Sequence, residues 1–139
     1  MIFVDQTILH DPENGQHGNC LSAVLASLLH LDIKNIPIFT APYPQWQVDL
    51  NTWLRQYDLA YIQLVDFKTY CNDVGIEGCY HEIAGTTERF NDVLHACVGI
   101  NGELTFDPQI DRSGLKEIVS SGIFIALKPW KIIEGSKSG

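Results

Sequence analysis

One stretch of the chain reads Gly18-Asn19-Cys20-Leu21-Ser22-Ala23-Val24-Leu25-Ala26-Ser27-Leu28-Leu29, directly after a polar, turn-rich segment. Its leucines and valine recur at helical spacing, which predicts a helix over residues 19–31 with one buried face. Asn19 is a favourable N-cap residue. Cys20 would lie in the first turn, where unpaired backbone N–H groups and the helix dipole favour a thiolate. Gly18 permits a sharp entry and leaves room for a group that approaches the sulfur.

A cysteine at the start of a helix is often only a small packing residue. A nucleophilic cysteine needs an imidazole within reach of the sulfur and a third group that orients the imidazole. Whether Cys20 is a nucleophile therefore depends on whether the rest of the chain supplies an imidazole and a group that orients it.

A predicted hairpin supplies both groups. Residues 95–100 and 103–107 read as strands, and Asn101-Gly102 between them is a strong two-residue turn signal. In the register of a type I′ turn, Asp107 pairs with the residue after His95, so that it lies one position diagonal from His95. A one-residue bulge would place the two directly opposite each other. The hairpin and the helix start together predict a Cys-His-Asp constellation.

The remaining elements surround this constellation. We expect an extended segment at 2–7, a second helix from Pro44, strands at 61–65, 79–84 and 123–127, a helical turn within 115–120, and a frayed tail over 134–139. The segment 67–78 is ambiguous, and 85–94 reads as a polar loop that could wall the site with Gly85 as a hinge. Helices followed by antiparallel strands indicate an α+β fold with the N-terminal helices packed on the sheet, in a single domain over 1–139.

Composition excludes several classes of protein. The chain has 139 residues, 45% of them hydrophobic and 19% charged, which indicates a globular domain. The net charge of −8 argues against nucleic acid as the main partner. We expect no membrane segment and no signal peptide, and a cytoplasmic location in a bacterial or phage-infected host cell. In that compartment the four cysteines are expected as free thiols or metal ligands.

The order of these motifs resembles that of the papain-like cysteine peptidases. The chain is similar to small bacterial and phage proteins of that superfamily in the motifs Val4-Asp5-Gln6-Thr7, Gly18-Asn19-Cys20, His95, Gly102-Glu103-Leu104, Asp107-Pro108 and Gly114-Leu115. The resemblance covers residues 4–128. It implies a papain-like hydrolase fold with Cys20, His95 and Asp107 as its catalytic residues, and it names no substrate.

That superfamily usually completes its oxyanion hole with a side-chain donor, commonly a glutamine about six residues before the cysteine. Asn14 occupies that position here, which is a departure. Gln6 is the first candidate, because the loop after it could fold back toward the cysteine. Gln16 and Asn19 are alternatives, and Gln6 could equally be an ordinary surface residue.

Other residues could take over single roles. His17 is close to the cysteine in sequence and could act as the base, although it has no obvious orienting partner. Asp111 is a second candidate for orienting the imidazole.

Zinc is the rival interpretation of the same residues. Cys79 and His81, and likewise His95 and Cys97, are two positions apart and so share one face of a strand. Four such ligands on paired strands could bind zinc tetrahedrally. Structural zinc sites usually use tight Cys-x-x-Cys knuckles, which this chain lacks. Zinc would also occupy His95, so the two interpretations exclude each other.

The sequence therefore predicts a thiol-dependent hydrolase: a peptidase, isopeptidase or amidase that acts on a protein or peptide-like substrate and uses neither cofactor nor metal. An acyltransferase or deamidase with the same three residues is one alternative. A non-catalytic protein-binding module, with or without zinc, is another. The oligomeric state is left open.

Overall fold

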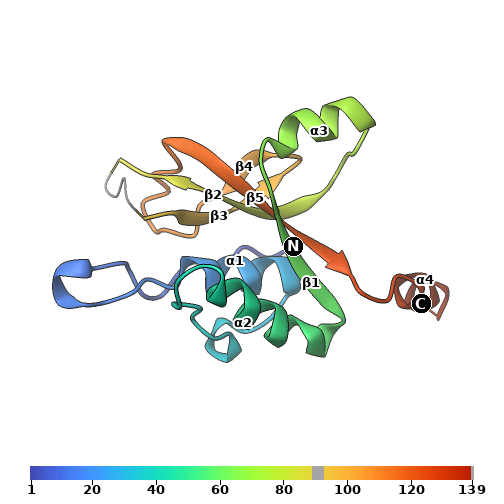
Figure 1. Ribbon diagram of the computed structural model, residues 1–139, viewed down its shortest axis with the longest axis horizontal. Helices are drawn as coiled ribbons and strands as arrows, with labels where there is room; N and C mark the ends of the chain where they lie inside the picture. The colour runs from blue at the N-terminus through green and yellow to red at the C-terminus, as the bar shows by residue number, and fades with distance from the viewer. Residues whose placement is uncertain (89–92, 139) are drawn as a thin grey trace. The chain divides into compact units, whose positions relative to one another are not determined.

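The computed structural model describes residues 1–88 and 93–138 (Figure 1). The helices are α1 (Cys20–Leu29), α2 (Gln45–Leu54), α3 (Phe67–Val74) and α4 (Trp130–Ser138), with short 3₁₀ turns at Pro12–Asn14, Ile33–Asn35 and Arg55–Tyr57. The strands are β1 (Leu59–Leu64), β2 (Tyr80–Thr86), β3 (His95–Ile100), β4 (Glu103–Phe106) and β5 (Glu117–Ala126), in the sheet order β1-β5-β2-β3-β4. The predicted α+β class is confirmed.

The chain forms two compact units. The first comprises residues 1–38 and 63–122, and the second comprises residues 39–62 and the chain from 123 onward. Strands β1 and β5 each continue from one unit into the other. All the predicted site residues belong to the first unit.

In the first unit, α1 packs against β3 and β2. Val24 contacts Ala96 and Val98 of β3 in a buried cluster. Every residue from Ser22 to Ser27 is buried, so the helix is enclosed around its middle rather than along one leucine face as predicted. The enclosed serine hydroxyls stay paired, since Ser27 Oγ donates to the Ala23 carbonyl and accepts from a backbone N–H of the N-terminal segment.

The predicted turn between β3 and β4 is confirmed. Asn101 and Gly102 both have positive φ, 50° and 83°, as a type I′ turn requires. The buried ring of His81 fixes the turn, because its Nε2 accepts the Gly102 N–H at 2.9 Å and its Nδ1 lies 2.7 Å from the Glu82 carbonyl. This histidine is therefore a structural residue of the hairpin.

A bulge in β4 changes the predicted register. Gly99 pairs with Leu104 but Val98 pairs with Phe106, so Thr105 is an extra residue in β4. Continued past β4, this register brings Asp107 beside Cys97. We expected a bulge to move Asp107 from Ala96 to the position opposite His95. The observed bulge moves Asp107 one position in the opposite direction along β3, to Cys97. Because side chains alternate between faces, the extra residue also moves Asp107 onto the face that carries His95.

Three other expectations are wrong. The segment 115–120 starts strand β5 instead of a helical turn, because Glu117 and Ile118 pair with the end of β2. Residues 134–138, most of the predicted frayed tail, belong to helix α4. Gly85 lies inside β2, paired on both sides, and is no hinge. A Cβ there would meet the Glu117 carbonyl oxygen at 1.9 Å, so the glycine is needed for close strand contact.

The second unit contains the predicted helix after Pro44, which is confirmed as α2. Leu50 and Leu54 of this helix are buried. Aromatic rings complete the packing: Trp46 lies 5.8 Å from Tyr61, and Tyr61 lies 5.7 Å from Phe124 of β5. These aromatic rings therefore belong to the core of this unit.

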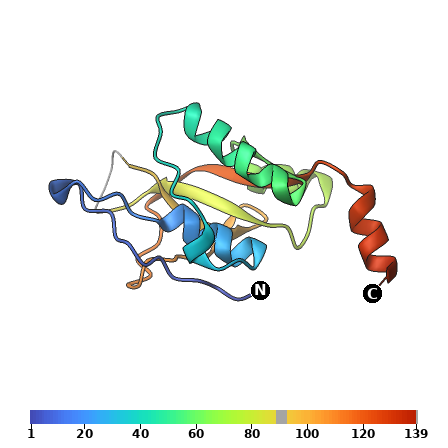
Figure 2. The same ribbon diagram turned by 90° about the horizontal axis from the view of Figure 1, so that it is seen from below.

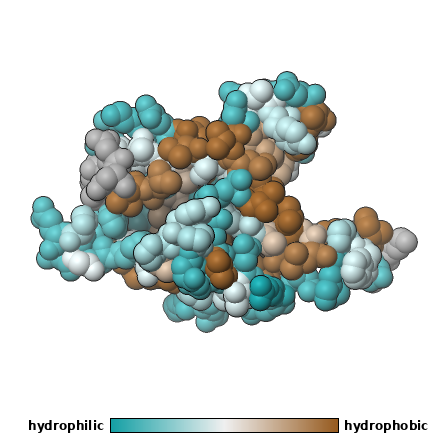
Figure 3. All heavy atoms as spheres, viewed as in Figure 1, coloured by the Kyte–Doolittle hydropathy of each residue, from teal (hydrophilic) through white to brown (hydrophobic). Residues whose placement is uncertain are grey.

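Hydrophobic side chains are exposed on part of the surface, as the brown areas of Figure 3 show. In the first unit, Val65, Ile118 and Val119 line a hollow of about 280 Å³ beside the start of α3. Within the described ranges, none of the helices has the length and apolar character needed to cross a membrane.

Candidate active site

The N-terminal segment is tied to the start of α1 by Asn19. Its Oδ1 accepts the N–H groups of Thr7 and Ile8 at 3.0 and 2.9 Å, and its Nδ2 donates to Thr7 Oγ1 at 2.9 Å. Asn19 occupies the N-cap position as predicted, but its side chain makes no cap hydrogen bond. Both amide atoms hold the neighbouring segment, and Asn19 is not among the residues that line the pocket beside Cys20.

Between that segment and α1, residues 8–17 form a loop that extends beyond the N-terminal end of the helix (Figures 1 and 2, blue). The loop is closed by paired backbone hydrogen bonds between Asp11 and Gln16. A Cβ on Gly18 would lie 2.8 Å from the backbone nitrogen of His10. The glycine is therefore needed for close contact with the backbone of His10, and it also lines the pocket beside the sulfur.

Cys20 is the first residue of α1 and is partly exposed. Its sulfur accepts the Ala96 N–H of β3 at 3.5 Å, and its side chain lines the same pocket as that of His95. Packing of α1 against β3 thus brings together two residues 75 positions apart in the sequence.

His95 joins the cysteine to the carboxylate. Its Nε2 lies 2.6 Å from Asp107 Oδ1, and the two side chains are only 11% and 3% exposed. Burial by itself would lower the pKa of His95. The hydrogen bond to Asp107, together with the neighbouring thiols of Cys20 and Cys97, outweighs burial and raises the pKa of this imidazole to about 12. The ring is therefore an imidazolium at neutral pH.

Backbone donors hold the Asp107 carboxylate in place. Oδ1 also accepts the Gln109 N–H at 2.9 Å, and Oδ2 accepts the Gly114 N–H at 2.7 Å. Burial would raise the pKa of Asp107, but the hydrogen bonds from His95 and from the two backbone groups lower it below its usual value. Asp111, the alternative orienting residue, pairs instead with Gln109 Nε2 and the Ser113 N–H.

A pocket of about 50 Å³ opens beside the sulfur. Its lining includes Gln6, Leu9, His17, Cys20, Leu94 and His95. The His17 ring stacks edge-on against His10 at 5.5 Å, and its Nδ1 lies 2.8 Å from the Gly18 carbonyl. The predicted wall over 85–94 is represented by Val93 and Leu94, while residues 89–92 lie outside the described part of the chain.

Of the three oxyanion candidates, Gln6 is the one that lines this pocket. It is 5% exposed, and its backbone N–H donates to the Pro108 carbonyl, next to Asp107. Its Nε2 donates one hydrogen to the Ile8 carbonyl at 3.0 Å, and a second hydrogen remains on the same atom. Gln16 instead donates to the Leu9 carbonyl on the exposed loop.

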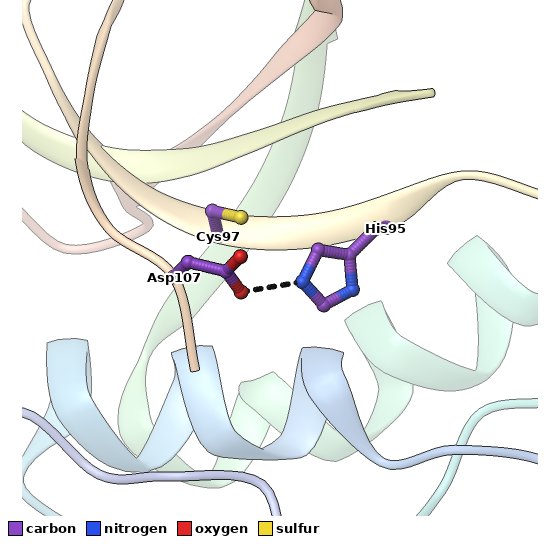
Figure 4. Close-up of side chains that lie close together, drawn as sticks. All are labelled: His95, Cys97 and Asp107. Atoms are coloured by element: carbon purple, nitrogen blue, oxygen red, sulfur yellow. Dashed lines mark hydrogen bonds and ion pairs between the residues drawn. The ribbon is translucent and has the colours of Figure 1, made fainter. Parts of the chain in front are cut away.

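The predicted zinc set does not assemble. Both ring nitrogens of His81 contact backbone groups, and Cys79 lies near Cys71 rather than near His95. A different group of potential ligands does form, from His95, Cys97 and Asp107, whose ligand atoms all lie within 4.8 Å of one another (Figure 4). Sequence spacing predicted the pairing of His95 with Cys97, and the bulge adds Asp107 to it.

Arg112 is a site neighbour that the sequence did not reveal. Its guanidinium donates to the carbonyls of Asp107 and Gln109 and pairs with the carboxylate of Asp5. It thereby fastens the loop after β4 to the N-terminal segment that carries Gln6. A lone arginine in a loop has no sequence signal for such a role.

The chain matches no protein-family model, no curated protein and no solved structure. The resemblance to papain-like peptidases therefore rests on the residues of this chain alone. Chemically, the site offers a thiol, an imidazole and a carboxylate in successive contact at the wall of a small pocket.

Proposed function

We propose that the protein is a thiol-dependent hydrolase of the papain-like kind, with Cys20 as nucleophile, His95 as acid and base, and Asp107 as the group that orients the imidazole. One observation carries the proposal: packing of α1 on β3 places the Cys20 side chain in one pocket with that of His95, whose Nε2 lies 2.6 Å from Asp107 Oδ1. Neither the helix-start cysteine nor the hairpin histidine would indicate catalysis alone.

The reaction follows from these contacts. The Cys20 sulfur attacks the carbonyl carbon of an amide, isopeptide or related acyl bond, and a C–S bond forms as the carbonyl becomes an oxyanion. The imidazolium of His95 donates its proton to the leaving nitrogen, the C–N bond breaks, and a thioester remains on Cys20. His95 then takes a proton from water, whose oxygen attacks the thioester and releases the acid and the thiol.

Electrostatics favour this use of the residues. The His95 imidazolium lies between the cysteine sulfur and a buried carboxylate, so it can stabilise a thiolate on one side while Asp107 stabilises the ring on the other. The unpaired N–H groups at the start of α1 add partial positive charge beside the sulfur. The nucleophile is thus prepared before substrate arrives.

The oxyanion is held by the Cys20 N–H together with the second hydrogen of Gln6 Nε2 in this proposal. Support for Gln6 comes from its burial in the pocket wall and from its backbone bond to Pro108, which fixes it relative to Asp107. The pocket has room for only a few water-sized groups, which favours a small acyl residue beside the sulfur.

The test uses p-nitrophenyl acetate, because an acetyl group suits a small pocket and the released nitrophenolate is coloured. We expect a burst of about one equivalent of nitrophenolate, followed by slower turnover, with the acetyl group found on the Cys20 peptide by mass spectrometry. Cys20→Ala should abolish the burst, and His95→Ala should slow it strongly.

Cys79→Ser is the matched control, since Cys79 is also a partly exposed thiol but lies outside the site. This variant should retain the burst. Acetylation of Cys79 as fast as that of Cys20, or a burst that His95→Ala leaves unchanged, would contradict the proposal.

A further inference from the structure

The site holds a second thiol that the proposed reaction does not use. Cys97 is completely buried on β3, two residues from His95, and its sulfur lies within 4.8 Å of a ring nitrogen of the imidazole. Figure 4 shows its sulfur turned toward Asp107 and His95. A hydrolase of this design needs one cysteine, so the second one calls for a separate explanation.

The three side chains form a donor set suited to zinc. One thiol sulfur, one imidazole nitrogen and one carboxylate oxygen lie within 4.8 Å of one another, from the residues Cys97, His95 and Asp107. Sulfur, nitrogen and oxygen donors of these types are those that Zn²⁺ binds, commonly with three protein ligands and an open fourth position. A harder cation such as Mg²⁺ would not be expected to use the thiolate.

The donors are held in place without a metal. Backbone N–H groups of Gln109 and Gly114 fix the carboxylate, and the regular pairing of β3 with β2 fixes the positions of His95 and Cys97. His95 Nε2 and Asp107 Oδ1, now 2.6 Å apart, would have to separate to about 3.3 Å to lie about 2 Å from one Zn²⁺, so binding requires a small shift of the ring or the carboxylate. The pocket at Cys20 and His95 gives an entry from solvent.

We propose that His95, Cys97 and Asp107 form a Zn²⁺ site that switches off the candidate nucleophile. Zn²⁺ takes the place of the proton between His95 Nε2 and Asp107 Oδ1, and the Cys97 thiolate supplies the third ligand. Binding releases two protons, one from Nε2 and one from the thiol. The metal-bound ring can no longer act as an imidazolium toward Cys20.

The metal site itself is independent of the proposed function, whereas its inhibitory effect rests on that function. Two kinds of measurement keep them apart. Metal binding is followed with Co²⁺, which substitutes for Zn²⁺ and gives a thiolate-to-metal charge-transfer absorption. Inhibition is followed as the effect of Zn²⁺ on the rate at which iodoacetamide alkylates Cys20, with each variant compared with its own metal-free rate.

Wild type should bind one equivalent of Co²⁺ with a charge-transfer band, and Cys97→Ser should lose the band and bind about tenfold more weakly or worse. Cys71→Ser is the matched control, because Cys71 is also a buried thiol but lies on α3. It should behave as wild type. Zn²⁺ should slow alkylation of Cys20 in wild type and in Cys71→Ser at concentrations that leave Cys97→Ser unaffected.

Histidine side-chain ¹⁵N NMR of the wild type supplies a test that needs no variant. Zn²⁺ should shift the ring nitrogens of His95 and leave those of His81 unchanged. A shift at the His10–His17 pair instead, a Co²⁺ band that survives in Cys97→Ser, or no binding at all would overturn the site. Binding at His95 without slower alkylation of Cys20 would overturn the switch while leaving the metal site intact.

Discussion

His95 Nε2 and Asp107 Oδ1 lie 2.6 Å apart because β4 contains one residue, Thr105, that has no partner in β3. Without the bulge, Asp107 would pair with Ala96 and project from the opposite face of the hairpin. A single unpaired residue therefore decides whether the hairpin can present an oriented imidazole to Cys20.

Replacing that carboxylate tests its role. Asp107→Asn keeps the shape of the side chain and an acceptor oxygen, but it removes the charge that stabilises the imidazolium. We expect acetylation of Cys20 by p-nitrophenyl acetate to slow by about two to four orders of magnitude. Asp111→Asn, in the same loop, should leave the rate unchanged. Equal effects of the two substitutions would assign Asp107 to loop structure only.

If Gln6 stabilises an oxyanion, its replacement should slow acetylation of Cys20 but not its alkylation. Gln6→Ala should lower the acetylation rate by about 10²–10³, because an acyl transfer passes through an oxyanion. Alkylation of Cys20 by iodoacetamide forms no oxyanion and should keep its rate. Gln16→Ala, which removes only a bond within the exposed loop, should change neither rate. Loss of both reactions in Gln6→Ala would indicate a disturbed fold.

Asn19 is expected to matter for stability through its acceptor oxygen. Asn19→Ala leaves the Thr7 and Ile8 N–H groups without a partner and should lower the free energy of unfolding by about 1–3 kcal/mol. Asn19→Asp keeps an acceptor for both groups, and the Thr7 hydroxyl can rotate to donate to it. Urea denaturation should therefore place Asn19→Asp close to wild type. Similar losses in both variants would show that the amide NH₂ carries the effect.

The hairpin turn should tolerate no side chain at Gly102. A Cβ on Gly102 would lie 2.4 Å from the backbone nitrogen of Lys68, and Gly102 has a φ of 83°. Gly15 also has a positive φ, 68°, but a Cβ there meets nothing within 4 Å. Gly15→Ala should cost only the conformational strain, about 1–2 kcal/mol, and Gly102→Ala clearly more. Thermal denaturation of the two variants checks the difference, and equal costs would exclude the contact with Lys68 as its cause.

His81 should make the fold sensitive to acid. Burial lowers the pKa of His81, only partly opposed by its bond to the Glu82 carbonyl, so the folded protein keeps this ring neutral. Below about pH 6.5 the unfolded chain binds a proton that the folded chain does not, and stability falls as the pH falls. His95 acts in the opposite direction in this range, because its raised pKa keeps the folded ring charged while the unfolded ring loses its proton as the pH rises through about 6.5. The contribution of His81 is therefore measured as the difference between wild type and a variant that lacks this ring, by urea denaturation at about pH 7 and pH 5.

The matched variant is His81→Gln, which offers an amide acceptor to the Gly102 N–H and cannot be protonated in this range. It should be less stable than wild type near neutral pH but should show a flatter dependence on pH. An unchanged slope in this variant would assign the acid sensitivity to other groups.

The sequence by itself determined the features that depend on neighbours along the chain. Helical spacing of leucines predicted α1, the Asn101-Gly102 pair predicted the type I′ turn, and helices followed by a run of antiparallel strands predicted the α+β class. Such features follow from local backbone preferences and periodicity, which a short window contains. They were enough to place Cys20 at a helix start and His95 at a strand start.

Tertiary structure decided everything that depends on contacts between distant segments. The bulge at Thr105 accompanies packing of Phe106 against the core cluster, and it brings Asp107 to His95 and Cys97. β5 forms over a segment predicted as a helical turn because β2 offers it a partner, and Asn19 binds the N-terminal segment rather than capping its own helix. Pairing energies of this kind are shared between two parts of the chain, so neither part reveals them alone.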